Sequence, residues 1–253
     1  MRVFVTGASS GIGAALARHY AARGAVLGLV ARRRDRLAAL AAELPGTHSC
    51  YALDVADAVA LHAAAADFIA CRGCPEVVIA NAGISVGTLA EEADDLPPLR
   101  RVFATNVFGM AQAFQPFIAA MKARGSGRLV GIASVAGIRG LPGAGAYSAS
   151  KAATIAWLEA LRVELRGSGI EVVTIAPGYI ATPMTAANPY PMPFLLSADE
   201  AARRFARAIE RGTSYTVIPW QMGLLAKLLR LLPNPVFDAL FARAKRKPRG
   251  LTV

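Results

Sequence analysis

The amino-acid sequence predicts an α/β protein built on a doubly wound parallel sheet of about seven strands, with helices on both faces. Short apolar runs alternate with longer helical patterns along most of the chain, as in successive βαβ units. The apolar runs are short, which is typical of parallel strands buried on both faces. With 253 residues, 55% of them hydrophobic, the chain is long enough for one such domain with a buried core.

The expected elements alternate in order along the chain. Strands are predicted at about 2–6, 25–31, 48–53, 76–80, 127–133, 170–176 and 214–218. Helices are predicted at about 11–24, 34–44, 56–72, 98–124, 147–168 and 197–212, and Ser197 with Glu200 forms a capping-box pattern at the start of the last. We assign 1–218 to a single domain, with 183–212 as the region over its binding site, and 219–253 to a helical C-terminal tail.

A glycine-rich turn follows the first predicted strand and opens the first helix. Its glycines let the backbone turn tightly and approach a pyrophosphate, whose charge is stabilised at the helix N-terminus. Such a turn alone could be an ordinary strand-to-helix loop, but its position directly after the first strand favours a dinucleotide site. The expected cofactor contacts in this turn are Gly7, Ser9, Ser10, Gly11, Ile12 and Gly13.

The end of the second predicted strand indicates which dinucleotide binds. An NAD site places a carboxylate there for the ribose 2′-hydroxyl, whereas this chain has Ala31-Arg32-Arg33-Arg34. A guanidinium fork suits a 2′-phosphate. If the arginines were only a solvated charge run, the carboxylate would still be missing. We therefore expect NADP, with Arg32 as the main contact, Arg33 as the second and Ser9 assisting.

Tyr147 and Lys151 are candidates for proton transfer. They lie four residues apart on a predicted helix, and therefore on one face of it, with Ser134 thirteen residues upstream. A nearby positive charge favours the phenolate and lowers the pKa of a tyrosine from about 10, which makes it a usable proton donor and acceptor. Alone, the pair is weak evidence, because both residues could lie on a solvated helix face.

The composition excludes several other kinds of site. Three cysteines, Cys50, Cys71 and Cys74, do not make a disulfide framework. Cys71 and Cys74 end a predicted helix before a strand, unlike a redox pair, and no further zinc ligands are arranged nearby, so no metal is expected. The histidines are scattered. Because the sequence has no signal-peptide pattern and no apolar run of about 18 residues, we expect a cytoplasmic protein.

Together these motifs resemble the short-chain dehydrogenase/reductase family over roughly residues 2–218. Each motif is common by itself, but their order and spacing are highly specific. The resemblance implies a Rossmann-type fold and an NAD(P)-dependent oxidoreductase acting on CH–OH and C=O groups. It rests on Thr6-Gly-x-x-x-Gly-Ile-Gly13, Asn81-Ala-Gly83, Asn106 in Asn-Val-Phe-Gly, Ser134, Tyr147-x-x-x-Lys151, and Pro177-Gly178 followed by Thr182.

The resemblance also implies roles for these positions. Tyr147 would pass a proton to the substrate oxygen as hydride arrives from the nicotinamide, and Ser134 would hold that oxygen. Lys151 would bind the nicotinamide ribose and lower the Tyr147 pKa, while Asn106 would keep a water in a proton relay to Lys151. Further cofactor contacts would be Asp54 and Val55 beside the adenine, Asn81, Ala82 and Gly83 on the adenosine side, and Pro177, Gly178 and Thr182 near the nicotinamide carboxamide.

The C-terminal part departs from the family pattern. Many members end in a strand that leads to a Gly-Gly turn and packs into a tetramer, whereas this chain continues after Trp220 through a leucine-rich stretch. A homodimer through the helices at 98–124 and 147–168 is the assembly that the resemblance then implies.

The tail is both apolar and basic. From Pro219 onwards it has seven basic residues and one acidic residue, over half of the chain's net charge of +11. Burying one leucine is worth about 1.5–3 kcal/mol, so the six leucines between 224 and 232 cannot all remain in water. Two alternatives follow. Residues 219–249 lie on an anionic membrane surface, which would place the protein peripherally on the inner leaflet. Alternatively, they pack on the body of the same chain or of a second copy and cover the pocket.

The expected function is NADPH-dependent reduction of a hydrophobic ketone, or the reverse oxidation of a secondary alcohol. One alternative is a 3-ketosphingoid or other lipid ketone reductase at a membrane surface, and another is a non-catalytic NADP-binding sensor or scaffold. Nucleic acid is not an expected partner, because no aromatic residues are interleaved with the tail's basic ones. No carboxylate or arginine is placed to hold an anionic substrate. The loop at 183–196 is expected to cover the site with the apolar residues Met184, Met192, Pro193, Phe194, Leu195 and Leu196.

Overall fold

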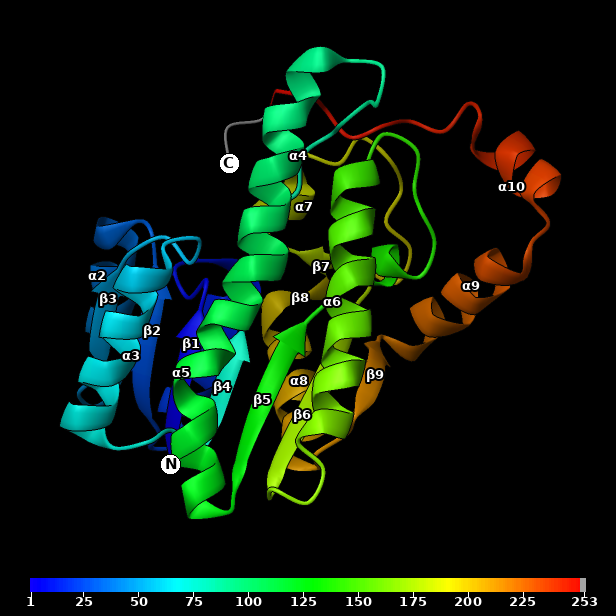
Figure 1. The fold of residues 1–253 in the computed structure, drawn as a ribbon. Coiled ribbons are helices and arrows are strands. Elements are labelled where there is room, and N and C mark those ends of the chain that lie inside the picture. The colour runs from blue at the N-terminus through cyan, green and yellow to red at the C-terminus, as the bar shows by residue number, and fades with distance from the viewer. Residues whose placement is uncertain (251–253) are drawn as a thin grey trace.

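A computed structural model describes residues 1–250 and has the predicted doubly wound architecture (Figure 1). Its main sheet has seven parallel strands in the order β3-β2-β1-β4-β5-β6-β9. Each strand bound lies within one residue of the predicted one, because apolar runs of this length leave a clear sequence pattern. The strands are β1 Arg2–Thr6, β2 Val26–Ala31, β3 Ser49–Ala52, β4 Val77–Ala80, β5 Gly127–Ile132, β6 Ile170–Pro177 and β9 Tyr215–Ile218.

Helices cover both faces of the sheet and bury two separate cores. On one face α1 (Gly11–Ala21), α2 (Arg34–Glu43) and α8 (Ala198–Glu210) pack on side chains such as Val3 and Val5. On the other face α3 (Ala58–Arg72), α5 (Gly109–Arg124) and α6 (Gly145–Glu164) pack on side chains such as Phe4. Successive residues of β1 serve opposite cores because strand side chains alternate between the two faces.

The predicted helix at 98–124 is interrupted. It consists of α4 (Leu96–Phe103), a π-helical turn at Ala104–Phe108, and α5. A π turn inserts one extra residue into a helix and is frequently found at functional sites. Here it contains Asn106, one of the predicted site residues.

A short irregular region follows β6. It contains β7 (Ile180–Ala181), α7 (Pro183–Ala186) and β8 (Leu196–Ser197), and β7 pairs with β8 in a separate small sheet. These elements were not predicted, since two-residue strands are too short to show a period. Ser197 caps α8 as expected, accepting a hydrogen bond from the Glu200 backbone N at 3.2 Å.

The tail forms two helices and then returns to the body. α9 (Trp220–Leu231) packs beside β9 through Met222, Gly223 and Ala226, and α10 (Asn234–Phe241) follows. Phe237 of α10 is buried beneath the Arg139 guanidinium, 3.8 Å from the ring centroid. Beyond α10 the chain crosses back over the carboxyl edge of the sheet towards α4 (red in Figure 1). Residues 251–253 of the predicted tail lie outside the described residues.

No helix formed by residues 1–250 is long and apolar enough to cross a membrane.

Candidate active site

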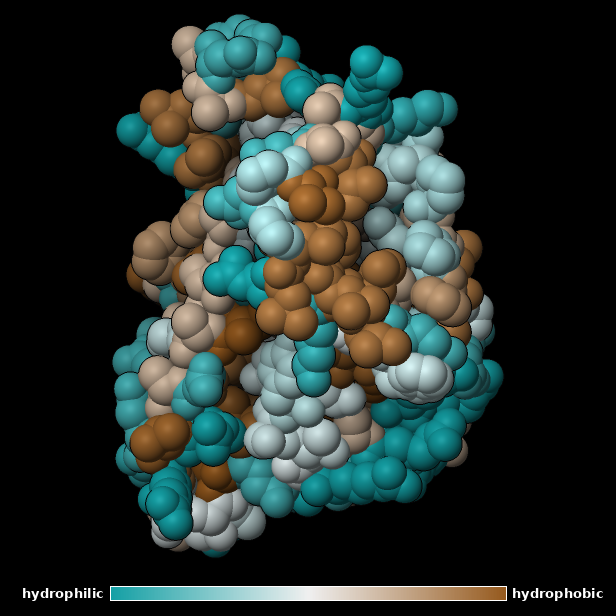
Figure 2. Space-filling model, turned by 90° about the vertical axis from the view of Figure 1, so that its right-hand side faces the viewer, coloured by the Kyte–Doolittle hydropathy of each residue, from teal (hydrophilic) through white to brown (hydrophobic). Residues whose placement is uncertain are grey.

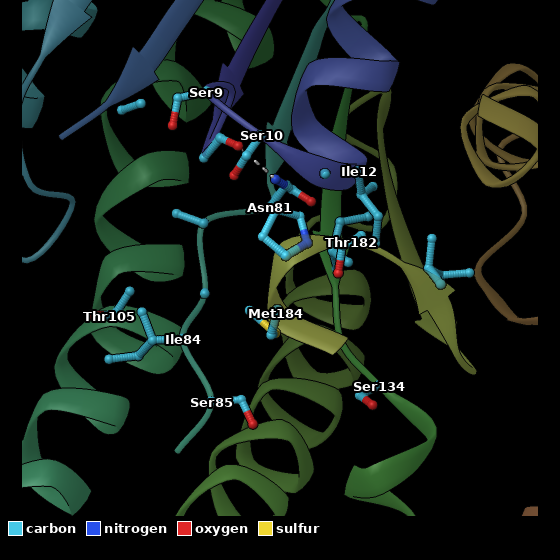
Figure 3. Close-up of a pocket in the computed structure, with 18 of the residues that line it drawn as sticks. Ser9, Ser10, Ile12, Asn81, Ile84, Ser85, Thr105, Ser134, Thr182 and Met184 are labelled. Atoms are coloured by element: carbon cyan, nitrogen blue, oxygen red, sulfur yellow. Dashed lines mark hydrogen bonds between the residues drawn. The ribbon is translucent and has the colours of Figure 1, made fainter. Parts of the chain in front are cut away.

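A cavity of about 600 Å³ lies at the carboxyl edge of the sheet, where β1 and β4 are neighbours. The strand order reverses between these two strands, and open α/β sheets bind ligands at such a switch point. Figure 3 shows the cavity extending from Ser9 and Ser10 beside α1 to Ser134 at the other end. Its volume is in the range of cofactor and small-molecule sites.

The glycine turn forms a bare backbone surface at one end of the cavity. A Cβ on Gly13 would lie 2.2 Å from the Gly7 carbonyl O, and Gly7 itself has a φ of +68°. The Asn81 side chain donates from Nδ2 to the carbonyl O of Thr6 at 3.1 Å and of Gly7 at 3.3 Å. The end of β4 therefore holds the turn in place, and the turn fits the predicted pyrophosphate cradle.

Most of the predicted cofactor residues line this one cavity. Gly13 lies behind the wall, packed on Gly7, and contributes by letting the turn close. The residues that form the wall are Gly7, Ser9, Ser10, Gly11, Ile12, Arg32, Arg33, Asp54, Val55, Asn81, Ala82, Gly83, Pro177, Gly178 and Thr182.

The two arginines occupy different environments. Arg33 donates from Nη2 to the hydroxyls of Ser9 at 3.2 Å and Ser10 at 3.1 Å, so it lies over the glycine turn. Arg32 faces the Asp54 carboxylate, with 3.8 Å between Nη1 and Oδ2. A phosphate group beside the turn would meet the Arg33 fork and two hydroxyls, a donor set that suits a dianion.

Ser134, Tyr147 and Lys151 gather at the end of β5. Ser134 has an extended backbone, with φ −170°, and its Oγ accepts from the Ala136 backbone N at 3.1 Å. The Ser134 side chain lies close enough to the Tyr147 hydroxyl to lower the Tyr147 pKa. Lys151, one turn further along α6, donates from Nζ to the Ile132 carbonyl O at 2.7 Å. All three residues line the cavity, so its wall offers a hydroxyl pair with an ammonium close by.

The Tyr147 pKa differs from the expected direction. Burial raises it, and the hydrogen bond with Ser134 only partly opposes that rise. The Lys151 ammonium lies 5.9 Å from the centroid of the Tyr147 ring and is held by Ile132, so the expected lowering by Lys151 is not found. Burial also lowers the Lys151 pKa, to about 8. Tyr147 therefore keeps its proton at neutral pH, as a proton donor must.

Asn106 is completely buried and does not line the cavity. Its Oδ1 accepts from the Ile84 backbone N at 2.8 Å, and its Nδ2 donates to the Ile84 carbonyl O at 3.1 Å and to Ser150 Oγ at 2.9 Å. Asn106 thus ties the segment after β4 to α6 one residue before Lys151. The water relay implied by the resemblance stays a prediction.

A family model described as short chain dehydrogenase matches residues 1–191, which include the glycine turn and all four predicted catalytic residues. This chain belongs to the short-chain dehydrogenase family. The fold and the cavity described above are consistent with this membership.

Two relatives and one solved structure illustrate the range of this family. An uncharacterized oxidoreductase of Myxococcus xanthus is 40% identical over 246 residues, covering 95% of this chain and 96% of its own. The 2-dehydro-3-deoxy-L-rhamnonate dehydrogenase (NAD(+)) of a Sphingomonas species is 37% identical over 180 residues, covering 71% and 72%. L-sorbose reductase from Gluconobacter frateurii, solved with NADPH and L-sorbose, superposes with a TM-score of 0.77 at 25% identity, covering 86% and 94%. The chain is an oxidoreductase of the short-chain dehydrogenase family.

The loop over the site of this short-chain dehydrogenase differs from the expected apolar cover. Within the described residues, Met184 is the one member of the predicted apolar set that lines the cavity. Phe194 and Leu195 are exposed, and Leu196 pairs with Ile180 in the small sheet. The loop closes back on itself through that sheet, which keeps its far end away from the cavity.

Sequence analysis missed a polar pair at the substrate end of this dehydrogenase site. Ser85 lines the cavity, and its Oγ accepts a hydrogen bond from Lys247 Nζ at 3.1 Å. The two residues are separated by 162 positions in the chain. No local pattern signals such a contact, which exists only because the tail returns to the body.

Proposed function

We propose that this protein is an NADPH-dependent carbonyl reductase that acts on hydrophobic ketones and, in reverse, on secondary alcohols. The observation that carries the proposal is that Tyr147 and Ser134 line the same cavity as the glycine turn. A proton donor and a dinucleotide cradle in one space are the two requirements of carbonyl reduction. The family relationship supports the same reaction class.

When bound, a nicotinamide dinucleotide supplies the hydride that the carbonyl carbon receives. The glycine turn would hold its pyrophosphate, and Arg33 with Ser9 and Ser10 would bind a 2′-phosphate. Lys151, anchored on Ile132, lies where its ammonium can also bind a ribose hydroxyl. The neighbour solved with NADPH supports this choice of cofactor.

The chain's own residues carry the proton. Ser134 would hydrogen-bond the substrate oxygen and hold it against Tyr147. Tyr147 would then donate its proton to that oxygen as the carbonyl becomes an alcohol.

The direct test is NADPH consumption by the purified protein across straight-chain ketones of rising length. We expect specificity to rise with chain length. Equal activity on short ketones would indicate a general carbonyl reductase, and turnover only of small polar sugars would contradict the hydrophobic substrate. Binding of NADPH without turnover of any carbonyl would favour a sensor or scaffold instead.

Replacing the arginines at the end of β2 tests the cofactor. We expect Arg33→Ala and Arg32→Ala each to lower kcat/KM for NADPH about 10- to 100-fold, because each removes charge-assisted hydrogen bonds to the 2′-phosphate. The value for NADH, which lacks that phosphate, should change little. Arg34→Ala is the matched control, since Arg34 begins α2 outside the cavity wall. A wild-type preference for NADH would contradict NADP as cofactor.

We also propose that the tail attaches the protein peripherally to an anionic membrane surface. Leu224, Leu228 and Leu231 lie on one side of α9 and are 55%, 55% and 79% exposed. Trp220 extends this stripe, and Figure 2 shows hydrophobic side chains gathered on the face that carries α9 and α10. The exposed cations Lys227 and Arg230 lie on the same helix. Apolar side chains flanked by cations are typical of helices that lie in a membrane interface.

Vesicle co-sedimentation tests the membrane proposal. We expect the protein to pellet with vesicles of phosphatidylglycerol and phosphatidylcholine, and less so at high salt, since each cation adds about 1 kcal/mol near an anionic surface. Leu228→Asp should weaken binding about tenfold or more. Val59→Asp is the control, because Val59 is an apolar residue on α3 that is even more exposed than Leu228, 82% against 55%. Wild-type protein that stays in the supernatant at all lipid concentrations would refute membrane contact.

The remaining organisation is also proposed. Residues 1–218 would form the catalytic domain and 219–253 an accessory tail, in a protein of the cytoplasmic compartment. Two apolar side chains on the expected dimer helices, Phe108 and Val163, are exposed and support a homodimer through that surface.

A further inference from the structure

The end of the tail places one lysine against the cavity wall. Lys247 is only 7% exposed, and its Nζ donates to Ser85 Oγ at 3.1 Å and to the Met184 carbonyl O at 3.3 Å. Ser85 and Met184 both line the cavity. Figure 3 shows them in the lower part of the view with Ser134, away from Ser9 and Ser10. Lys247 therefore lies directly behind two residues of the cavity wall, at the end of the cavity that holds Ser134.

Contacts on both sides hold Lys247 in this position. The Arg249 guanidinium pairs with Asp95 at 2.8 Å and with Glu92 at 3.0 Å. The Gly87 backbone N donates to the Pro248 carbonyl O at 3.0 Å, and a Cβ on Gly87 would lie 2.2 Å from the Lys247 carbonyl O. The tail thus approaches the body at a point where only glycine leaves room for it.

The Lys247 charge has no counter-charge in this structure. Among residues 1–250 no carboxylate forms an ion pair with it, and both of its hydrogen-bond acceptors are neutral. Burial without a charged partner is costly for an ammonium group, and it lowers the Lys247 pKa. An anion nearby would stabilise the charged form.

Ser85 connects this charge to the cavity. The Ser85 side chain is buried, and its Oγ accepts the hydrogen bond from Lys247. A hydroxyl that accepts through its oxygen still has its own hydrogen to donate. Because the Lys247 ammonium polarises it, the Ser85 hydroxyl is a strengthened donor for an acceptor in the cavity that Ser85 lines.

We propose that Ser85 and Lys247 form an anion-binding subsite, and that the substrate is an apolar ketone carrying a carboxylate or phosphate at a distance from its carbonyl. Ser85 would contact the anion, and Lys247 would act through its charge as the specificity-determining residue. This deepens, and rests on, the proposed carbonyl reductase function. It also disfavours a 3-ketosphingoid base, whose ammonium group would meet a like charge.

Paired substrates test the proposal. We would measure NADPH-dependent reduction of oxo-carboxylic acids of rising chain length and of their methyl esters, which keep the ketone and lose only the charge. The expected wild-type result is a kcat/KM about 10- to 100-fold higher for the acid of matching length, which is the worth of one hydrogen bond to a charged group. Equal kcat/KM for acid and ester at every length would overturn the subsite.

Variants separate a charge effect from a structural one. Lys247→Met should reduce the acid-to-ester ratio about 10- to 100-fold, mainly through a higher KM for the acid, and Lys247→Arg should restore most of the ratio. Ser85→Ala should reduce the ratio in the same direction. The matched control is Lys245→Met, an exposed lysine two residues away, which should leave the ratio as in the wild type.

The outcomes distinguish this inference from the proposed function. If Lys247→Met lowered kcat/KM equally for acid and ester, Lys247 would only anchor the tail, and the subsite would be wrong. Thermal unfolding and NADPH affinity of each variant show whether the protein is still folded. If the wild type reduced neither the acids nor the esters, the carbonyl reductase proposal itself would fail. Reduction of the esters with no preference for the acids would refute the anion-binding subsite and leave the carbonyl reductase proposal in place.

Discussion

Replacing Tyr147 by phenylalanine is expected to lower kcat for ketone reduction by about 10²- to 10⁴-fold, the usual contribution of a positioned proton donor. Phenylalanine keeps the ring and removes only the hydroxyl of Tyr147, which lines the same cavity as Ser134. The cradle for the cofactor lies at the other end of the cavity. NADPH affinity should therefore stay within about twofold, because that substitution removes no group placed against the cofactor phosphates.

Steady-state kinetics with a reducible ketone and fluorescence titration with NADPH measure the two quantities separately. Tyr20→Phe is the matched control, because the Tyr20 hydroxyl is buried away from the cavity and has no hydrogen-bond partner among the described residues. It should leave both kcat and NADPH affinity unchanged. Full turnover by Tyr147→Phe would show that another group donates the proton, and would remove the main support for the proposed reaction.

Gly13→Ala is expected to weaken NADPH binding by at least about tenfold and to lower the melting temperature. The added methyl carbon would lie 2.2 Å from the Gly7 carbonyl O and 2.6 Å from Asn81 Nδ2, well inside contact distance. Gly7 belongs to the turn that forms the pyrophosphate cradle, and Asn81 holds that turn in place, so relief of the clash must move the turn. A loss of about 1–3 kcal/mol in stability would accompany the loss of binding.

Thermal unfolding and the dissociation constant for NADPH measure this effect. Gly140→Ala is the control, since a Cβ there meets no atom within 4 Å and the residue has no positive φ. It should leave both quantities unchanged. Unaltered NADPH affinity in Gly13→Ala would mean that the cofactor does not approach the backbone at this turn.

Local sequence patterns predicted most of the framework. The seven strands of the main sheet were located within one residue because each is a short buried run bounded by turn residues. The glycine turn and the Tyr147–Lys151 spacing were recognisable because their geometry is set within a few residues of chain. The resemblance to a known family then connected Asn81, Asn106 and Ser134 to the same site, and the structure brings these residues to adjoining strand ends.

Other features depend on contacts between distant segments. The Tyr147 pKa rises because elements from several parts of the chain bury the residue, an effect that spacing along a helix does not encode. Asn106 is hydrogen-bonded to Ile84 and Ser150, and these three residues come from three different parts of the chain. The sequence also does not say which side of α9 packs on the body: Met222 and Ala226 are buried there, whereas Leu224, Leu228 and Leu231 stay exposed. Membrane contact of that exposed side stays a prediction.

By itself the sequence determined the fold class, the order of the strands and helices along the chain, and the chemical groups available for proton transfer and dinucleotide binding. It did so because hydrophobic periodicity, glycine turns and helical spacing are short-range properties. Only the tertiary structure decided that Lys247 lies behind Ser85 and that Lys151 is held by Ile132. Those contacts join residues far apart in the chain, and their energies depend on burial and on charges that become neighbours only on folding.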